Sequence, residues 1–203
     1  MNIAIIIITA LVSLYAFSNR EVFDRLKFNA YAIKNYGQGW RFFSYGLIHA
    51  DWLHLLVNMF VLYSFGKVVS EAFHFYFDLK GYLFYILLYI GGIVFSVLFD
   101  FGKYKDDKYY NAVGASGAVS AVLFSSIIIF PANSLYLMFI PVPIPAAVFG
   151  VLYLIYSAVM AKRAQDNIGH NAHFWGAVYG IVFTIAIKPR LAVEFLDQIR
   201  NLF

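Results

Sequence analysis

The stretch Gly114-Ala115-Ser116-Gly117 opens an apolar segment, residues 115–130, that has the length of a helix and contains no charged residue. A turn of such small residues leaves the Ser116 hydroxyl sterically open, and a helix start places it beside backbone N–H groups without helical partners. A second apolar segment begins at Ala172-His173-Phe174-Trp175-Gly176. Ser116 is therefore a candidate nucleophile, and His173 is its candidate partner.

The composition predicts a membrane protein. The 203 residues are 62% hydrophobic and 13% charged, whereas soluble domains are about 45–50% apolar and about 25% charged. Apolar windows predict six spanning helices at residues 2–18, 43–66, 81–99, 115–130, 144–161 and 172–188. We expect an all-α fold, one polytopic membrane domain over residues 1–203 arranged as a six-helix bundle. The fourth and sixth windows are short for a span of about 20 residues, so they should begin below the surface or be shielded by protein.

The connections between the windows differ in character. Residues 19–42 mix charges with apolar residues, which predicts an ordered interfacial loop. Residues 131–145 carry four prolines and no charge, which predicts a non-helical hydrophobic loop. The tail, residues 189–203, repeats apolar residues at helical spacing and is expected to lie along the membrane surface. The first window lacks a basic flank and a clear cleavage site, so it favours an anchored helix over a signal peptide.

Several classes of partner are disfavoured by composition. The chain has no cysteine, which excludes disulfides and thiolate metal sites. Its net charge of +4 suits anionic lipid headgroups, and no basic run with interleaved aromatics predicts a nucleic-acid surface.

Polar side chains in the second window point to a buried site. The window is expected to begin its helix at His49, and it carries His54 and Asn58 four residues apart on one helix face. Polar groups inside spanning helices are costly and usually face the bundle interior. Helices two, four and six begin on the same side, so His54, Asn58, Ser116 and His173 can converge at similar depth.

Small residues predict that the fourth and sixth helices pack closely. His173, Gly176 and Gly180 form one stripe, and Gly117 with Ala121 forms a small face beside Ser116. Close approach would bring the Ser116 hydroxyl to the His173 imidazole, as serine activation requires. No carboxylate is expected deep in a helix, which predicts a Ser-His dyad. His54, Asn58 and the Ser116 N–H would donate to a developing oxyanion.

Four motifs together resemble the signature of rhomboid intramembrane serine proteases. They are Trp40-Arg41, His49-x4-His54-x3-Asn58, Gly114-x-Ser116-Gly117 and Ala172-His173-x2-Gly176-x3-Gly180. They occur in the family's order and spacing, and they cover nearly the whole chain.

The resemblance implies Ser116 as nucleophile, His173 as general base, and His54 with Asn58 in the oxyanion hole. It implies that transmembrane protein substrates enter past the fifth helix and are cut within or next to their spanning segments, with no metal and no cofactor. Gly114, Gly117, Gly176 and Gly180 are expected to pack near the site. The expected location is the cell membrane, with the lipid bilayer as partner; the oligomeric state is not indicated.

Two positions depart from the family pattern. Ser120 stands where many rhomboids have an aromatic that packs on the catalytic imidazole, so support for His173 must come from elsewhere. The interval from Gly66 to Glu71 is one residue longer than usual.

The charge distribution conflicts with the family's orientation. Ten of the 15 Lys and Arg residues lie in loops after odd-numbered helices, which predicts that this side is cytoplasmic. The resemblance implies the opposite orientation, with the active side outside the cytoplasm, and we adopt it because the long first loop can hold its charges in structure.

Other interpretations remain open. Ser116 could be a packing serine or a cap, and His54 and Asn58 could join helices through hydrogen bonds. A catalytically silent relative could bind membrane clients, although such relatives typically lose the serine or histidine. A small transporter would predict internal symmetry and mid-membrane charges, and neither is visible.

For the remaining polar residues we expect structural, interfacial or solvated positions. Zinc or haem ligation by His49, His54, His170 and His173 is disfavoured, because no His-Glu-x-x-His pattern is present. His49 is expected to be structural or pH-responsive near the surface, without direct chemistry. His74 and His170 are expected at the interface. The helix-end acids are expected to be solvated; they are Asp51, Asp100 and Asp166.

Overall fold

The computed structural model describes residues 1–137, 140–163 and 168–202. Most of the chain is helical, and the elements follow in chain order. They are α1 (Asn2–Ser18), α2 (Arg20–Leu26), α3 (Ala30–Tyr36), α4 (Arg41–Ser44), the 3-10 helix η1 (Tyr45–Leu47), α5 (Trp52–Phe77), α6 (Lys80–Tyr104), α7 (Ser116–Ile129), β1 (Ser134–Leu137), β2 (Ile140–Pro145), α8 (Ala146–Arg163), α9 (His170–Ile187) and α10 (Arg190–Arg200).

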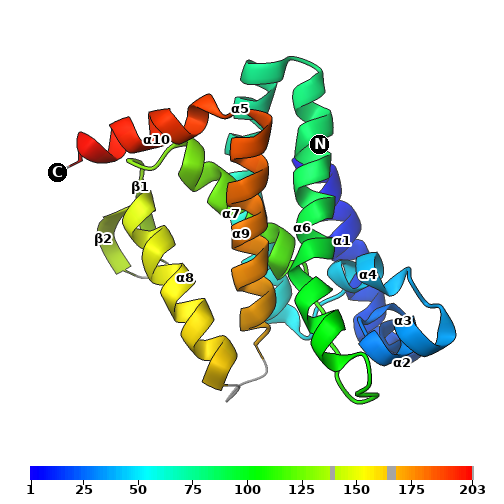
Figure 1. The fold of residues 1–203 in the computed structure, drawn as a ribbon. Coiled ribbons are helices and arrows are strands. Elements are labelled where there is room, and N and C mark those ends of the chain that lie inside the picture. The colour runs from blue at the N-terminus through cyan, green and yellow to red at the C-terminus, as the bar shows by residue number, and fades with distance from the viewer. Residues whose placement is uncertain (138–139, 164–167, 203) are drawn as a thin grey trace.

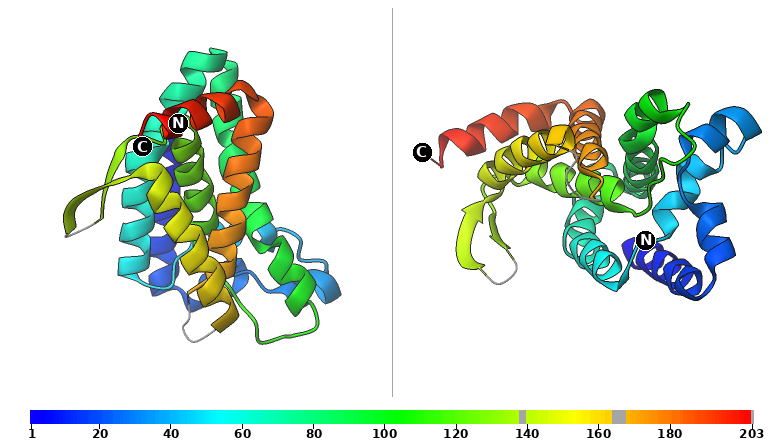
Figure 2. Two further views of the ribbon diagram at one scale, coloured as in Figure 1. Left: turned by 60° about the vertical axis from the view of Figure 1, so that its left-hand side comes forward. Right: turned by 90° about the horizontal axis from the view of Figure 1, so that it is seen from below.

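The long helices form a bundle in which consecutive members run in opposite directions (Figure 1). Helices α5, α7 and α9 begin toward the end of the bundle where α2, α3 and α4 lie, which we call the loop end. Seen from below, the β-hairpin and α10 extend to one side of the bundle, and the first loop extends to the other (Figure 2). The predicted common starting side of the second, fourth and sixth helices is therefore confirmed.

Helix α7 is the centre of the bundle. Every residue from Gly117 to Ile129 is buried, and α5, α6 and α9 all pack against it. Its sequence is apolar or small all round, which is typical of a helix with no solvent-facing side. Its 14 residues span about 21 Å at 1.5 Å per residue, so α7 does not reach across a hydrocarbon core of about 30 Å.

Three described helices are long and apolar enough to cross a membrane: α5, α6 and α8. Helices α9 and α10, bent by 112° at their junction, count as a fourth span when taken together. Helices α1 and α7 are apolar but shorter. All six predicted segments are thus helical, but three to four meet the requirements of a span.

The predicted boundaries of the second helix were wrong. The expected window, 43–66, includes α4 and η1, and the long helix α5 begins only at Trp52. Asp51 ends the preceding extended backbone and caps α5 by accepting the backbone N–H of His54 at 2.8 Å. The helix then continues past Gly66 to Phe77 and includes Lys67, Ser70 and Glu71.

The all-α prediction needs one correction. The proline-rich segment is non-helical as predicted, but its described residues form the antiparallel pair β1 and β2 rather than a plain loop. A register shift between Tyr136 and Leu137 interrupts the pairing. Prolines are compatible with this hairpin because both strands of a two-stranded sheet are edges.

The first loop is ordered, as predicted, and it is tied to the loop before α7. Phe28 and Ala112 form a β-bridge, and the Asn29 amide donates to the carbonyls of Lys108 and Tyr110 at 3.0 and 3.1 Å. Arg41 is buried and donates to backbone carbonyls of the same loop. The chain that leads into the Ser116 turn is therefore held from the side.

The predicted amphipathic tail forms α10, and its apolar face packs on α7 and α9. Leu191 is fully buried there, and Gln198 donates to the Ile129 carbonyl at 3.4 Å. The tail therefore covers the C-terminal end of α7.

Candidate active site

The turn before Ser116 depends on a left-handed glycine. Gly114 has φ +115°, which side chains with a Cβ rarely adopt, and its N–H donates to the Tyr45 carbonyl at 3.0 Å. Ser116 follows as the first residue of α7 and is half-buried. The sequence therefore places a half-buried serine at the start of an otherwise buried helix.

His54 lies directly against this turn. A Cβ built on Gly114 would lie 2.5 Å from His54 Cε1 and 2.8 Å from His54 Nε2. The close approach requires glycine at 114. It places the His54 imidazole of α5 against a residue that lies two positions before Ser116 in the chain. Asn58 lies one turn further along α5, is buried, and donates to the His54 carbonyl at 2.9 Å. The two predicted oxyanion residues thus share one face, as expected.

His49 holds the Gly114–Ser116 turn through a hydrogen bond to its backbone. Its Nε2 accepts the Ala115 N–H at 3.4 Å, so the ring proton resides on Nδ1, which donates to Ser13 Oγ at 2.9 Å. Ser13 in turn donates to the Leu47 carbonyl at 2.9 Å. His49 was expected near the surface but is fully buried. Burial, reinforced by the neighbouring His54, lowers its pKa to about 3, so it stays neutral and structural.

Helices α7 and α9 cross at the predicted glycines. A Cβ on Gly176 would lie 2.9 Å from Gly117 Cα, and a Cβ on Gly180 would lie 2.7 Å from Ala121 Cα. Both positions admit only glycine, because the obstruction is backbone. His173 lies one turn before Gly176 on the same face of α9, and Ser116 immediately precedes Gly117. The crossing therefore brings the starts of both helices to the same place.

The aromatic support of His173 comes from α8. The rings of Tyr153 and His173 have centroids 6.3 Å apart and planes 28° apart, and the Tyr153 hydroxyl lies 2.8 Å from Ser120 Oγ. The position where many rhomboids carry an aromatic thus holds a serine that binds an aromatic from another helix. Tyr153 was not predicted from the sequence, because no motif distinguishes it from the other 15 tyrosines.

Asp100 corrects one prediction. It was expected to be a solvated helix end, but it is buried at the loop end of α6. Tyr110 donates to its Oδ2 at 2.8 Å and Asn171 donates to its Oδ1. Asn171 lies two residues before His173, so this carboxylate helps to fix the start of α9. Asp51 is exposed as expected, and Asp166 lies outside the described residues.

The other two histidines differ in their distance from the predicted site. His170 was expected at the interface but is buried, with its ring edge-on to Tyr156 at 5.4 Å and to His173 at 6.0 Å. His74 is exposed near the opposite end of α5 and stacks on Tyr82 at 4.9 Å. Within the described ranges, no group of three or more His, Asp or Glu side chains is arranged to hold a metal ion.

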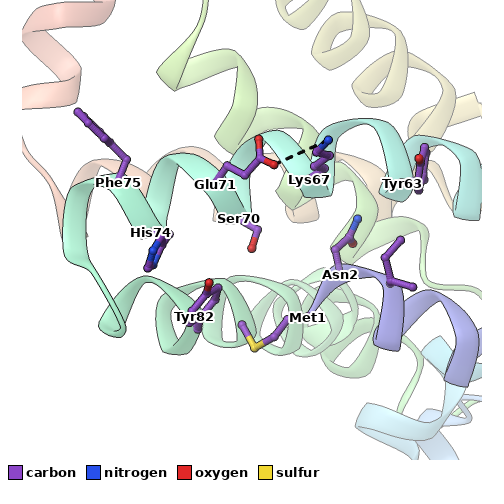
Figure 3. Close-up of a pocket in the computed structure, with 10 residues that line it drawn as sticks. Met1, Asn2, Tyr63, Lys67, Ser70, Glu71, His74, Phe75 and Tyr82 are labelled. Carbon is purple, nitrogen blue, oxygen red and sulfur yellow. Dashed lines mark ion pairs between the residues drawn. The ribbon is translucent and has the colours of Figure 1, made fainter.

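A surface hollow of about 590 Å³ lies at that opposite end (Figure 3), and its lining does not include Ser116. Glu71 lines it and pairs with Lys67 at 3.9 Å. Gly66 leaves room for Asn2 of α1, which accepts from the Tyr85 hydroxyl at 2.7 Å and donates to the Leu62 carbonyl at 2.9 Å. The Gly66 to Glu71 interval therefore concerns the packing of α1, remote from the site.

Comparison with known proteins gives the family. The model of the Rhomboid domain matches residues 36–190. The chain is 30% identical over 151 residues to "RHOMBOID-like protein 12, mitochondrial" of Arabidopsis thaliana, covering 69% of the chain and 44% of the relative. It is 26% identical over 143 residues to the human "Presenilin-associated rhomboid-like protein, mitochondrial", covering 66% and 34%.

A bacterial relative is a named protease. The chain is 24% identical over 176 residues to "Rhomboid protease AarA" of Providencia stuartii, covering 78% of the chain and 59% of the relative. The chain spans less than two thirds of the length of each of these relatives. The match to the family model and the membrane-length helices together show that this chain is an integral membrane protein of the rhomboid family.

Proposed function

We propose that the chain is an intramembrane serine endopeptidase that cleaves membrane proteins within or next to their transmembrane segments. The observation that carries the proposal is the crossing of α7 and α9 at Gly117 and Gly176, with His54 against the Ser116 turn. That arrangement gathers a serine, a histidine and hydrogen-bond donors at the starts of three helices. The relative named as a protease adds support from the family.

In the proposed reaction, Ser116 Oγ attacks the scissile carbonyl while His173 accepts its proton. The imidazolium then gives that proton to the leaving amine, and water hydrolyses the acyl-enzyme with His173 again acting as base. The Ser116 N–H, His54 and Asn58 would donate to the oxyanion. Loss of one such donor typically lowers turnover by about 100- to 1,000-fold.

The setting of the reaction is also part of the proposal. Transmembrane proteins would be the substrates, reaching Ser116 sideways past α8 from the surrounding bilayer. We propose a cell membrane location with the loop end outside the cytoplasm. Two relatives have "mitochondrial" in their names, so the membrane in which this chain resides has to be measured.

Labelling of the detergent-solubilised protein with a fluorophosphonate probe tests the proposal. We expect Ser116→Ala to abolish labelling and His173→Ala to reduce it by at least about 100-fold. Ser126→Ala, a buried serine near the other end of the same helix, serves as the control and should label normally.

Cleavage of transmembrane substrates in proteoliposomes, with the cut site read by mass spectrometry, supplies the second readout. Labelling that persists in Ser116→Ala would overturn the proposal. A folded protein that stays silent toward smaller electrophiles as well would instead support a client-binding relative.

A further inference from the structure

One tyrosine joins three helices beside the candidate base. The Tyr153 ring of α8 faces His173 of α9, and its hydroxyl is bonded to Ser120 of α7. The same ring packs on Phe124 of α7, with centroids 5.5 Å apart, and on Phe149 of α8, at 5.8 Å. Ser120 is itself buried, so its hydrogen bond with Tyr153 is partly shielded from solvent.

Helix α8 is otherwise the least embedded of the candidate spans. The share of its apolar window buried within the molecule is 22%, compared with 28% in α5 and 39% in α6. Its outer face exposes large apolar side chains, including Leu152, Ile155 and Tyr156. Its position against the bundle therefore depends on a small inner surface, and Tyr153 lies between Gly150 and Ser157, two of the buried residues of α8.

We propose that Tyr153 is a positioning residue for His173, and that the Ser120–Tyr153 hydrogen bond couples the seating of α8 on α7 to the orientation of the imidazole. This inference rests on the proposed function. Its basis is the arrangement in which one ring contacts the candidate base while its hydroxyl is held by the helix that carries the candidate nucleophile.

The physical argument concerns rotation of the imidazole. A histidine at a helix start can rotate about χ1 and χ2, and serine activation needs one narrow range of these angles. A parallel aromatic face removes alternative orientations, provided that the aromatic is itself fixed. The bond to Ser120 fixes Tyr153, so outward movement of α8 removes the bond and the ring face in one step.

A set of variants separates the bond from the ring. Tyr153→Phe and Ser120→Ala each delete the bond and keep the ring, so each should slow Ser116-dependent labelling by about fivefold. The double variant should be no slower than either single variant, because both remove the same interaction. Tyr153→Leu also removes the ring face and should slow labelling by about 100-fold. Ile155→Ala, on the outer face of α8, is the control and should match the wild type.

A rescue variant distinguishes positioning from general stabilisation. Ser120→Tyr combined with Tyr153→Leu supplies an aromatic from α7 into the space left by Tyr153, and we expect it to regain most of the lost labelling rate. Thermal unfolding midpoints should not follow the rates across this set. Rates that simply follow unfolding midpoints, or an unimpaired Tyr153→Leu in an active background, would overturn the inference and leave the proposed function intact.

A readout without catalysis keeps the two proposals separate. In ¹⁵N-histidine NMR spectra of the detergent-solubilised protein, the His173 signal is assigned by its loss in His173→Ala. Tyr153→Leu should shift that signal and leave the remote His74 signal in place. An unchanged His173 signal would overturn the inference even where the wild type fails to label and the proposed function itself is lost.

Discussion

Helices α7 and α8 follow one another in the chain but differ in how much of each helix is buried. From Gly117 to Ile129 every residue of α7 is buried, and the helices around it approach its backbone where glycines allow. Along α8 only Ala146, Gly150 and Ser157 are buried. The candidate nucleophile Ser116 thus belongs to the most buried helix. Tyr153, beside the candidate base, belongs to a helix with few buried residues.

The difference separates two kinds of constraint. Around α7 the constraint is steric and comes from backbone against backbone, so any side chain larger than hydrogen is excluded at Gly176 and Gly180. Around α8 the constraint is a few side-chain contacts that can be broken and remade. Substitutions at the α7–α9 crossing should therefore affect folding, and those on α8 should affect the site.

The largest effect is expected at the crossing itself. Gly176→Leu places a side chain where Gly117 Cα would be 2.9 Å from the new Cβ, with backbone that cannot give way. We expect loss of the folded protein, measured as monodisperse yield and thermal unfolding in detergent. The comparison is Gly150→Ala on α8. Its Cβ would meet only side-chain atoms, the nearest being Ile127 Cδ1 at 3.3 Å and Phe124 Cε1 at 3.4 Å, and the change should cost about 1 kcal/mol or less. Equal effects of the two changes would contradict the contrast between the helices.

The next effect concerns pH and His49. The pKa of His49 is lowered from 6.5 to about 3, chiefly by burial and then by His54, while Asp51 acts weakly in the opposite direction. Below about pH 6.5 the unfolded chain binds a proton at this position that the folded chain does not. The free energy of unfolding should therefore fall as the pH decreases toward 3, by up to about 1.4 kcal/mol per pH unit.

Denaturant unfolding between pH 7 and 4 measures this slope. His49→Gln, which removes the titrating group, should flatten the slope, and His74→Gln at the exposed position should leave it unchanged. A slope that persists in His49→Gln would assign the acid sensitivity to other groups.

The smallest effect is expected from a side-chain bond between the two enclosed helices. Thr184 of α9 donates to Ser125 of α7 at 2.7 Å in a fully buried setting. Thr184→Val keeps the shape and removes the donor, and it should lower the free energy of unfolding by about 1 kcal/mol. Reversible unfolding in mixed micelles measures the change. A loss of stability in Thr184→Val as large as that in Gly176→Leu would mean that side-chain hydrogen bonds, and not backbone contact, stabilise the crossing.

Much of this arrangement follows from local sequence. The apolar windows predict the helices because a hydrocarbon solvent demands them, and the spacing from Gly176 to Gly180 predicts the crossing because only small residues permit it. His54 and Asn58 are indicated by the cost of polar groups in a span. These features depend on residues within one or two turns of one another.

The features that were missed depend on distant partners. The start of α5 is set by the Asp51 cap within an apolar window, where hydropathy has no signal for it. Tyr153 meets His173 across 20 residues of sequence, and Asp100 meets Asn171 across 71. Neither pairing leaves a periodic trace, so only the folded chain reveals them.

The unequal helix lengths have a consequence for the surrounding lipid. Helix α5 has 26 residues and α8 has 18, which correspond to about 39 Å and about 27 Å. We expect a bilayer with about 30 Å of hydrocarbon to meet helices of different length on the two flanks, and mismatch of this kind costs a fraction of a kcal/mol per ångström. Neighbouring helices of low hydrophobic length should therefore partition toward the α8 flank.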